Sequence, residues 1–201
     1  MNKKILIGVL VVVVIAIVGG FTLLGSNGFS FHFGGDDFDT NMYNAGDASA
    51  EASTIEYEIQ KAINDKSKKG IEKNVNSTNE LMPLYKKMDV SLNKALNSTD
   101  NETKKEYLKS AIKLNEYSEN YTKENQLIFK AEQDFENKKI SANEYNKKFD
   151  SYTASYDKYT ENLKKTTKKI KDLLDKNPEL IEELKSYGLT GIYIGEFGYY
   201  T

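Results

Sequence analysis

The chain contains 201 residues, of which 39% are hydrophobic and 29% are charged, and its formal net charge is −2 at pH 7. It has no Cys and its 28 basic residues are all Lys, which excludes disulfides and thiolate chemistry and disfavours recognition of phosphate or guanine by bidentate Arg. Because the chain also lacks the basic footprint that is typical of duplex binders, we expect no nucleic-acid partner.

The N-terminus carries the strongest pattern in the chain. After residues 1–4, an apolar run extends from Ile5 to Leu24 without a charged residue. About 20 residues in a helix, at ~1.5 Å each, span ~30 Å, which matches the hydrocarbon core of a bilayer. The run therefore predicts a transmembrane helix over residues 5–24.

Charges on either side of this run predict its orientation. Lys3 and Lys4 precede it, whereas residues 25–50 contain neither Lys nor Arg. The positive-inside bias places residues 1–4 in the cytoplasm and the rest of the chain outside the cell membrane. A cleaved signal peptide is the alternative, but its apolar region usually has about 7–15 residues and ends in an A-x-A pattern, which is absent here. We therefore expect an uncleaved signal anchor.

Residues 25–50 are rich in Gly, Asp, Ser and Ala and show no helical apolar period, which predicts a flexible acidic linker. Within it, Asp37–Asn41 matches the D-x-D-x-N start of a calcium loop. Met42 replaces the required Gly and Ala48 replaces the bidentate Glu, so we expect no metal site. The single histidine, His32, has no Cys or carboxylate cluster with which to bind zinc.

Residues 51–187 show helical periodicity throughout and predict an extracytoplasmic helical bundle. A first helix is expected over roughly residues 51–69, and a second continues to about Asn97. Pro83 falls inside the second helix. It should either kink that helix or begin a new one, with Asn79 as the candidate cap.

Two stripes with alternating spacings of four and three residues predict the longest helices. They comprise Tyr107, Ala111, Leu114, Ser118, Tyr121, Asn125, Ile128, Glu132 and Phe135, and then Tyr145, Phe149, Tyr152, Tyr156, Tyr159, Leu163, Thr166, Ile170 and Leu173. Each set lies along one face of a helix. Asp100 is the expected N-cap of the first helix, and Ser141 with Glu144 forms a capping box for the second. The short connection predicts an antiparallel hairpin of helices about 50 Å long.

The aromatic side chains of the second stripe allow two interpretations. A Tyr ring favours burial while its hydroxyl requires water or a hydrogen bond, so these side chains should form a wide core with hydroxyls at its rim. An aromatic ligand groove is the alternative.

The C-terminal part contains one further helix and a tail. Asn177 and Pro178 predict the start of a short helix that runs through Tyr187 and ends at Gly188. Residues 188–201 form an aromatic tail, for which disorder is the default expectation. Its strand-like residues could instead pair with Phe29–Phe33 as a ribbon or lie at the bilayer surface.

The remaining motifs predict no catalytic, cofactor or metal site. Ser91–Lys94 spells S-x-x-K, but the companion K-T-G is missing, and no phosphate-binding Gly-rich loop occurs. A lysine cluster over residues 164–171 could contact anionic polymer or lipid headgroups, although a solvated helix face is the simpler interpretation. The sequons at Asn76, Asn97 and Asn101 are candidate N-glycosylation sites, and the last two flank an expected inter-helix loop.

Together these patterns predict an all-α, single-pass membrane protein with an elongated antiparallel bundle outside the cell. We expect a non-enzymatic structural or protein-interaction role, with a protein partner or homo-oligomer and without a cofactor. The alternative is an extracytoplasmic small-molecule-binding or sensory domain whose ligand is unknown. A sensor needs a cytoplasmic output domain, and only residues 1–4 would lie inside, which favours the first hypothesis.

Overall fold

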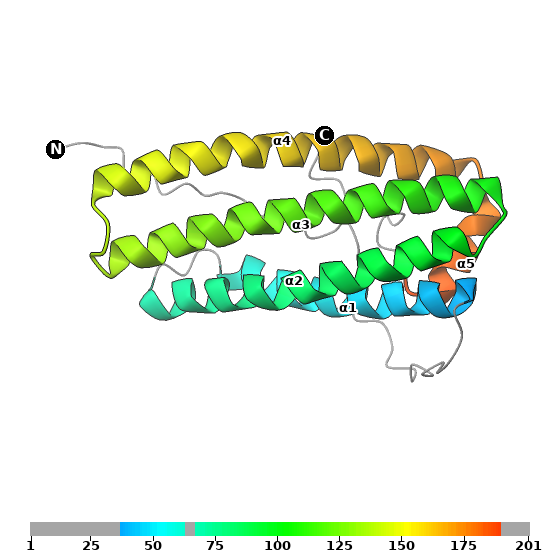
Figure 1. Ribbon diagram of the computed structural model, residues 1–201, viewed down its shortest axis with the longest axis horizontal. Coiled ribbons are helices and arrows are strands. Elements are labelled where there is room, and N and C mark those ends of the chain that lie inside the picture. The colour runs from blue at the N-terminus through cyan, green and yellow to red at the C-terminus, as the bar shows by residue number, and fades with distance from the viewer. Residues whose placement is uncertain (1–36, 63–66, 190–201) are drawn as a thin grey trace.

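A computed structural model describes residues 37–62 and 67–189 of the chain. These residues form five α-helices and no strand, which confirms the predicted all-helical class (Figure 1). The helices are α1 (Phe38–Ala62), α2 (Lys68–Asn97), α3 (Glu102–Glu136), α4 (Ala142–Asp175) and α5 (Pro178–Ser186). None of them is apolar enough over a sufficient length to cross a membrane. The apolar run over residues 5–24, Phe29–Phe33 with His32, and residues 190–201 all lie outside the described residues.

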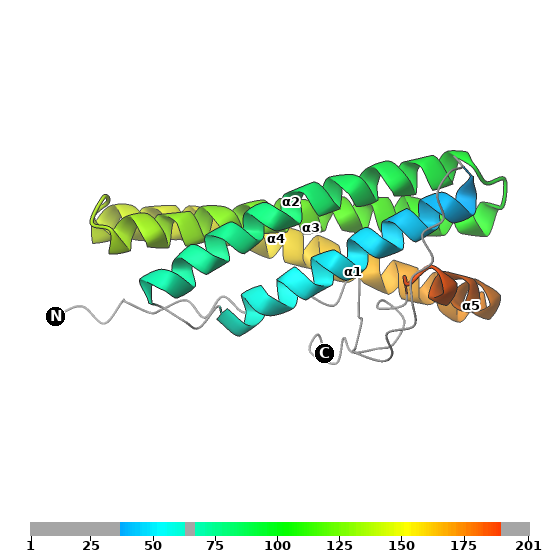
Figure 2. The same ribbon diagram turned by 90° about the horizontal axis from the view of Figure 1, so that it is seen from below.

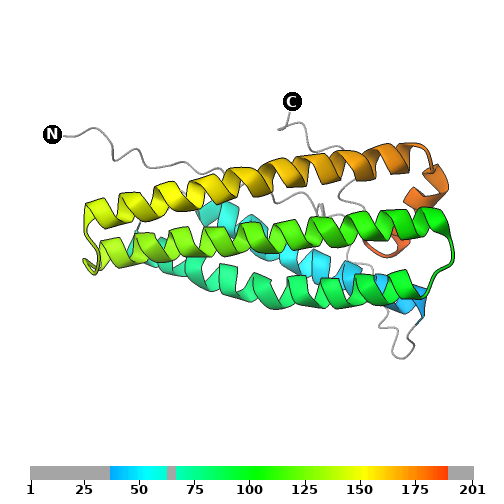
Figure 3. The ribbon, with the colours of Figure 1, turned by 45° about the horizontal axis from the view of Figure 1, so that its top comes forward.

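The helices form an antiparallel bundle in which chain neighbours pack together. Among the described helices, extensive contacts join α1 to α2, α2 to α3 and α3 to α4. In Figure 1, α4, α3 and α2 lie one below the other, and Figure 3 shows α1 crossing behind that layer at an angle. Figure 2 shows α5 beside the first turns of α1. The bundle is therefore an open row of long helices, with α5 at one end.

The α3–α4 hairpin follows its local signals closely. Ser141 Oγ accepts from the Glu144 backbone N at 3.3 Å, and Glu144 Oε2 accepts from the Ser141 backbone N at 2.8 Å, so the predicted capping box is confirmed. The N-cap of α3 is Asn101 rather than Asp100, because Asn101 Oδ1 accepts from the Lys104 backbone N at 3.0 Å. An amide oxygen caps as well as a carboxylate, so the helix begins one residue later than expected.

The C-terminus of α3 ends in a left-handed turn that reverses the chain. Lys138 has φ 58°, its backbone N donates to Phe135 O at 2.9 Å, and the Lys139 backbone N donates to Asp134 O at 2.8 Å. This pair of bonds is a Schellman motif. The predicted antiparallel hairpin is thereby confirmed.

The predicted linker over residues 25–50 is wrong for residues 38–50, which belong to α1. Asp37 starts this helix, because its Oδ1 accepts from the Thr40 backbone N at 2.7 Å. The first half of α1 buries mainly small side chains at helical spacing, which allow close approach of the neighbouring backbones. They are Ala45, Ala48, Ser49 and Ala52, together with Met42. Because these side chains are small, the buried face lacks the large apolar residues that usually mark an amphipathic helix.

The break between the first two helices also differs from expectation. α1 ends at Ala62 and Ser67 caps α2, so Gly70 lies buried in the first turn of α2 rather than near the end of a preceding helix. Pro83 lies inside α2, which continues as one helix, and its ring is exposed. Asn79 is not a cap; its Oδ1 accepts a hydrogen bond from Gln126 Nε2 on α3.

α5 packs against the start of α1 through a close backbone contact. Gly188 has φ 76°, its N donates to Lys185 O at 3.1 Å, and Leu189 N donates to Leu184 O at 3.0 Å, which confirms the predicted glycine stop. A Cβ added to Gly46 on α1 would lie 1.7 Å from the Tyr187 carbonyl oxygen. Only glycine fits there, so this contact sets the position of α5 against α1.

Both predicted stripes face inward. The first is buried from Tyr107 to Ile128, and the second is buried at Tyr156, Leu163 and Ile170. Near the end of α4 the buried positions move by one residue, to Thr167 and Leu174. A straight helix has 3.6 residues per turn, so it drifts relative to a strict seven-residue repeat. The core interpretation of the aromatic stripe therefore holds for its buried members.

Candidate functional site

A buried polar cluster joins α1, α2 and α3. Tyr85 Oη donates to Glu56 Oε1 at 2.5 Å, and Thr122 Oγ1 donates to Tyr85 Oη at 3.2 Å. The three residues are 7%, 1% and 4% exposed for Glu56, Tyr85 and Thr122, respectively. Glu56 is placed there because it follows Ala52 by four residues and precedes Ile59 by three, and both of these residues are buried on the same face of α1.

The environment of this cluster favours a neutral carboxyl group. Burial raises the pKa of Glu56 to about 8, and the hydrogen bond from Tyr85 lowers it only in part. Burial and the adjacent Glu56 raise the pKa of Tyr85, with a smaller contribution from Glu119 on α3. At neutral pH the cluster therefore holds a proton on Glu56. The cluster is buried and links α1, α2 and α3 through its hydrogen bonds.

A row of buried polar side chains extends this polar cluster along α3. Asn115, Ser118, Thr122 and Asn125 follow one another at spacings of three and four residues, and all are buried. Asn115 Nδ2 donates to the Tyr85 carbonyl oxygen at 2.8 Å. Within the described residues, Asn115 Oδ1 and Ser118 Oγ have no hydrogen-bond partner. Buried polar groups of this kind reduce stability and restrict which helix surfaces can pair.

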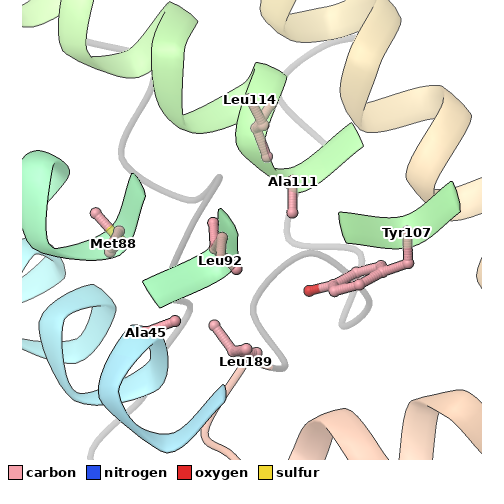
Figure 4. Close-up of a pocket in the computed structure, with 7 residues that line it drawn as sticks. All are labelled: Ala45, Met88, Leu92, Tyr107, Ala111, Leu114 and Leu189. Atoms are coloured by element: carbon pink, nitrogen blue, oxygen red, sulfur yellow. The ribbon is translucent and has the colours of Figure 1, made fainter. Parts of the chain in front are cut away.

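One apolar cavity between the described helices is too small for a metabolite. It has a volume of about 20 Å³ and is lined by Ala45, Met88, Leu92, Tyr107, Ala111, Leu114 and Leu189 (Figure 4). Small-molecule sites usually have roughly 300–1,000 Å³, whereas this space is close to that of one water molecule. Figure 4 shows the Tyr107 ring reaching across it toward Leu92 and Leu189. We regard it as a packing gap.

The turn between α3 and α4 presents aromatic side chains at the end of the bundle opposite α5. We call residues 135–149 the hairpin tip. The rings of Phe135 and Tyr145 stack with centroids 5.2 Å apart, and Tyr145 and Phe149 lie 6.1 Å apart. All three are half-buried, and α4 contains no buried residue before Tyr156. In Figures 1 and 3 the hairpin tip extends beyond the ends of α1 and α2.

The lysines of the predicted cluster do not all lie on the same surface of α4. An open groove of about 430 Å³, here called the lysine groove, is lined by Glu106, Lys165, Lys168, Lys169, Asp172, Leu173 and Lys176. Lys169 Nζ lies 3.6 Å from Glu106 Oε1 across the α3–α4 interface. Lys171, which belongs to the predicted cluster, instead pairs with Asp175 at 2.6 Å and does not line the groove.

The candidate glycosylation sites are all exposed but do not form one group. Asn97 is the last residue of α2 and Asn101 caps α3, so the two lie together at the α2–α3 turn. Asn76 lies well away from this turn, near the other end of α2. Asn101 Oδ1 accepts the capping hydrogen bond from the Lys104 backbone N.

The S-x-x-K and D-x-D-x-N motifs lie on α2 and at the start of α1, respectively. Ser91 is buried and Lys94 is exposed, so S-x-x-K does not form a paired nucleophile and base. Asp37 caps α1, and no group of three or more potential metal ligands occurs within residues 37–62 and 67–189. Sequence reasoning missed Glu56. Its spacing from Ala52 and Ile59 is the available signal, but the charge of a glutamate argues against burial.

Comparison of the chain with protein-family models, curated proteins and solved structures finds no match.

Proposed function

We propose that the chain is a single-pass membrane protein, anchored by residues 5–24, whose helical bundle acts outside the cytoplasm as a non-enzymatic structural or protein-interaction module. One observation carries this proposal. The start of α1, where the anchor would join, lies beside α5, while the hairpin tip lies at the opposite end (Figure 1). Tyr187 Oη donates to Asp39 Oδ1, and the rings of Phe38 and Tyr187 lie 6.2 Å apart. The start of α1 and the hairpin tip are therefore separated by about the length of α4, roughly 50 Å.

The exposed features of the hairpin tip support an interaction role. Its aromatic rings are half-exposed, and α4 packs mainly against α3. Tyr and Phe side chains combine a large apolar surface with few rotatable bonds, and they are enriched at protein–protein contacts. By contrast, within the described residues the Glu56 cluster is closed and the cavity lined by Met88 and Leu92 is close to the size of a single water molecule. A partner protein or a second copy of the chain fits these features better than a metabolite.

The membrane part of the proposal can be tested by labelling intact cells, because the chain has no native Cys. We expect Lys147→Cys, on an exposed face near the hairpin tip, to react with a membrane-impermeant maleimide. Asn2→Cys should react only after permeabilisation, and alkaline carbonate should not extract the chain. Release by carbonate, or the reverse labelling pattern, would show that the assignment is wrong.

The interaction part requires a separate measurement on the full chain in detergent micelles. We expect sedimentation to show self-association or binding of a co-purified protein that is weakened by Tyr145→Lys. Ala154→Lys, at an exposed position of α4 outside the hairpin tip, adds the same single positive charge and serves as the control. A strictly monomeric chain that a small molecule strongly stabilises against heat would instead support the alternative ligand-binding function.

A further inference from the structure

The lysine groove lies at the end of the bundle where the proposed anchor joins. It occupies the last turns of α4, and these share an end with α5 and the start of α1 (Figure 1). Lys104 Nζ on α3 and Glu183 Oε1 on α5 form an ion pair at 2.5 Å, which ties these elements together. Residues 25–36 connect the apolar run to α1 and reach at most about 40 Å when fully extended. A membrane holding the anchor would therefore lie within reach of the groove.

The charges of the groove fit a layer of anionic groups. Four lysines line it against two carboxylates. Lys169 pairs with one of them, Glu106, and Lys165 pairs with Glu161 beside the groove at 2.7 Å. Lys168 and Lys176 have no ion-pair partner within the described residues. Lysines on flexible stems act as mobile point charges, which suit many loosely placed phosphates better than one fixed anion. The wide opening of the groove likewise suits a surface rather than an enclosed ligand.

The end of the bundle formed by α5 and the start of α1 is acidic, and this charge determines which side of the bundle would face the membrane. Glu179 on α5 and Asp37 before α1 are both exposed there. An anionic surface would repel this end of the bundle and attract the side of α4 that carries the lysine groove. The contact would therefore turn only the C-terminal end of α4, which carries the lysine groove, toward the bilayer.

We propose that the lysine groove binds the anionic phospholipid headgroups of the membrane that holds the anchor. This inference rests on the proposed function above. Each lysine contributes only weakly near an anionic surface. The anchor compensates, because it makes the contact intramolecular and so gives the headgroups a high effective concentration at the groove. The lysines would contact the phosphate groups, which belong to the lipid headgroups and not to a free anion in solution.

The test uses the full chain in nanodiscs of neutral phosphatidylcholine, with or without anionic phosphatidylglycerol. Acetylation rates of individual lysines are read by mass spectrometry. We expect acetylation of Lys165, Lys168, Lys169 and Lys176 to slow several-fold in anionic nanodiscs only. The effect should disappear in about 0.5 M salt, because the Debye length falls from about 10 Å at 0.1 M toward about 3 Å at 1 M. Lys147 and Lys148, at the other end of α4, should react equally in both lipids.

Matched variants separate a local contact from general charge. The double variant Lys168→Gln with Lys176→Gln should lose most of the protection at Lys165 and Lys169, whereas Lys147→Gln with Lys148→Gln should keep it. All four substituted positions are exposed, so folding should be unaffected.

Equal acetylation in both lipids, or protection in neutral nanodiscs by added soluble polyphosphate alone, would overturn the headgroup assignment. A chain that does not enter nanodiscs at all would instead overturn the proposed function.

Discussion

The substitution Glu56→Gln provides the most direct test of the buried polar cluster. Gln has nearly the shape of Glu, its carbonyl oxygen can accept the hydrogen bond from Tyr85, and it carries no charge at any pH. The side chain of Glu56 is 7% exposed and its hydrogen bond to Tyr85 measures 2.5 Å, so the replacement keeps the contact and removes only the titration. The variant should therefore lose the part of the pH dependence that belongs to Glu56.

The size and sign of the effect follow from the pKa of Glu56. Its folded value of about 8 exceeds the ordinary value of 4.5, because burial disfavours the charge. The folded state therefore holds the proton more tightly than the unfolded state does. The stabilisation from this group is complete below about pH 4.5 and is lost as the pH rises to about 8. About 3.5 pH units at ~1.36 kcal/mol each give an upper limit of about 5 kcal/mol.

The assay is urea unfolding of the full chain in nonionic micelles, followed by circular dichroism between about pH 5 and pH 8. We compare the free energies of unfolding of the variant and the wild type at each pH, because exposed carboxylates then cancel. The variant should gain stability over the wild type steadily as the pH rises, by several kcal/mol in total. Glu51→Gln, at an exposed position of α1, should show no such gain.

A second variant keeps the reasoning testable if Glu56→Gln folds poorly. The hydrogen bond from Tyr85 lowers the pKa of Glu56, so Tyr85→Phe should raise that pKa and extend the pH dependence to higher pH. Parallel pH profiles for the wild type and Glu56→Gln would refute the conclusion that Glu56 is protonated when folded.

Three further predictions concern single contacts, each measured as a change in the free energy of unfolding. Gly46→Ala should destabilise the chain by more than ~2 kcal/mol, because the new Cβ would lie 1.7 Å from the Tyr187 carbonyl oxygen and force α5 away. Ser141→Ala should cost ~1 kcal/mol by removing the capping box of α4. The buried hydroxyls of Tyr121 and Tyr156 form a hydrogen bond. The single variants Tyr121→Phe and Tyr156→Phe should each cost ~1 kcal/mol, and the double variant should cost less than their sum.

The controls for the first two of these predictions lie on the same helices. Ala50→Gly, half-buried on α1, should cost only the ~1 kcal/mol of helix propensity. Ser151→Ala, exposed inside α4, should have little effect or stabilise slightly. Equal losses for Gly46→Ala and Ala50→Gly would show that α5 does not pack closely on α1. Strict additivity in the tyrosine pair would show that the two hydroxyls act independently.

The α3–α4 hairpin could be predicted from the sequence because its signals are local and mutually consistent. The stripe from Tyr107 to Ile128 repeats at helical spacing, and the capping box of Ser141 and Glu144 marks the residue at which the second helix begins. The first half of α1 could not be predicted in this way. Its buried face consists of small residues, and the need for glycine at Gly46 arises only from the Tyr187 backbone of a segment far along the chain. Composition rich in Gly, Asp, Ser and Ala suggested a linker where tertiary packing makes a helix.

The candidate sites show the same division between local and tertiary information. Lys165, Lys168, Lys169 and Lys176 share a face of α4 by helical spacing alone, and a sequence reader could group them. That Glu106 lies across from Lys169, and that Lys171 pairs with Asp175 outside the groove, depends on how α3 packs against α4. Glu56 is the harder case, because its spacing from Ala52 and Ile59 indicates burial while its charge argues against it. Burial of Glu56 depends on a hydrogen-bond donor from another helix, here Tyr85 on α2, and a single sequence does not specify that donor.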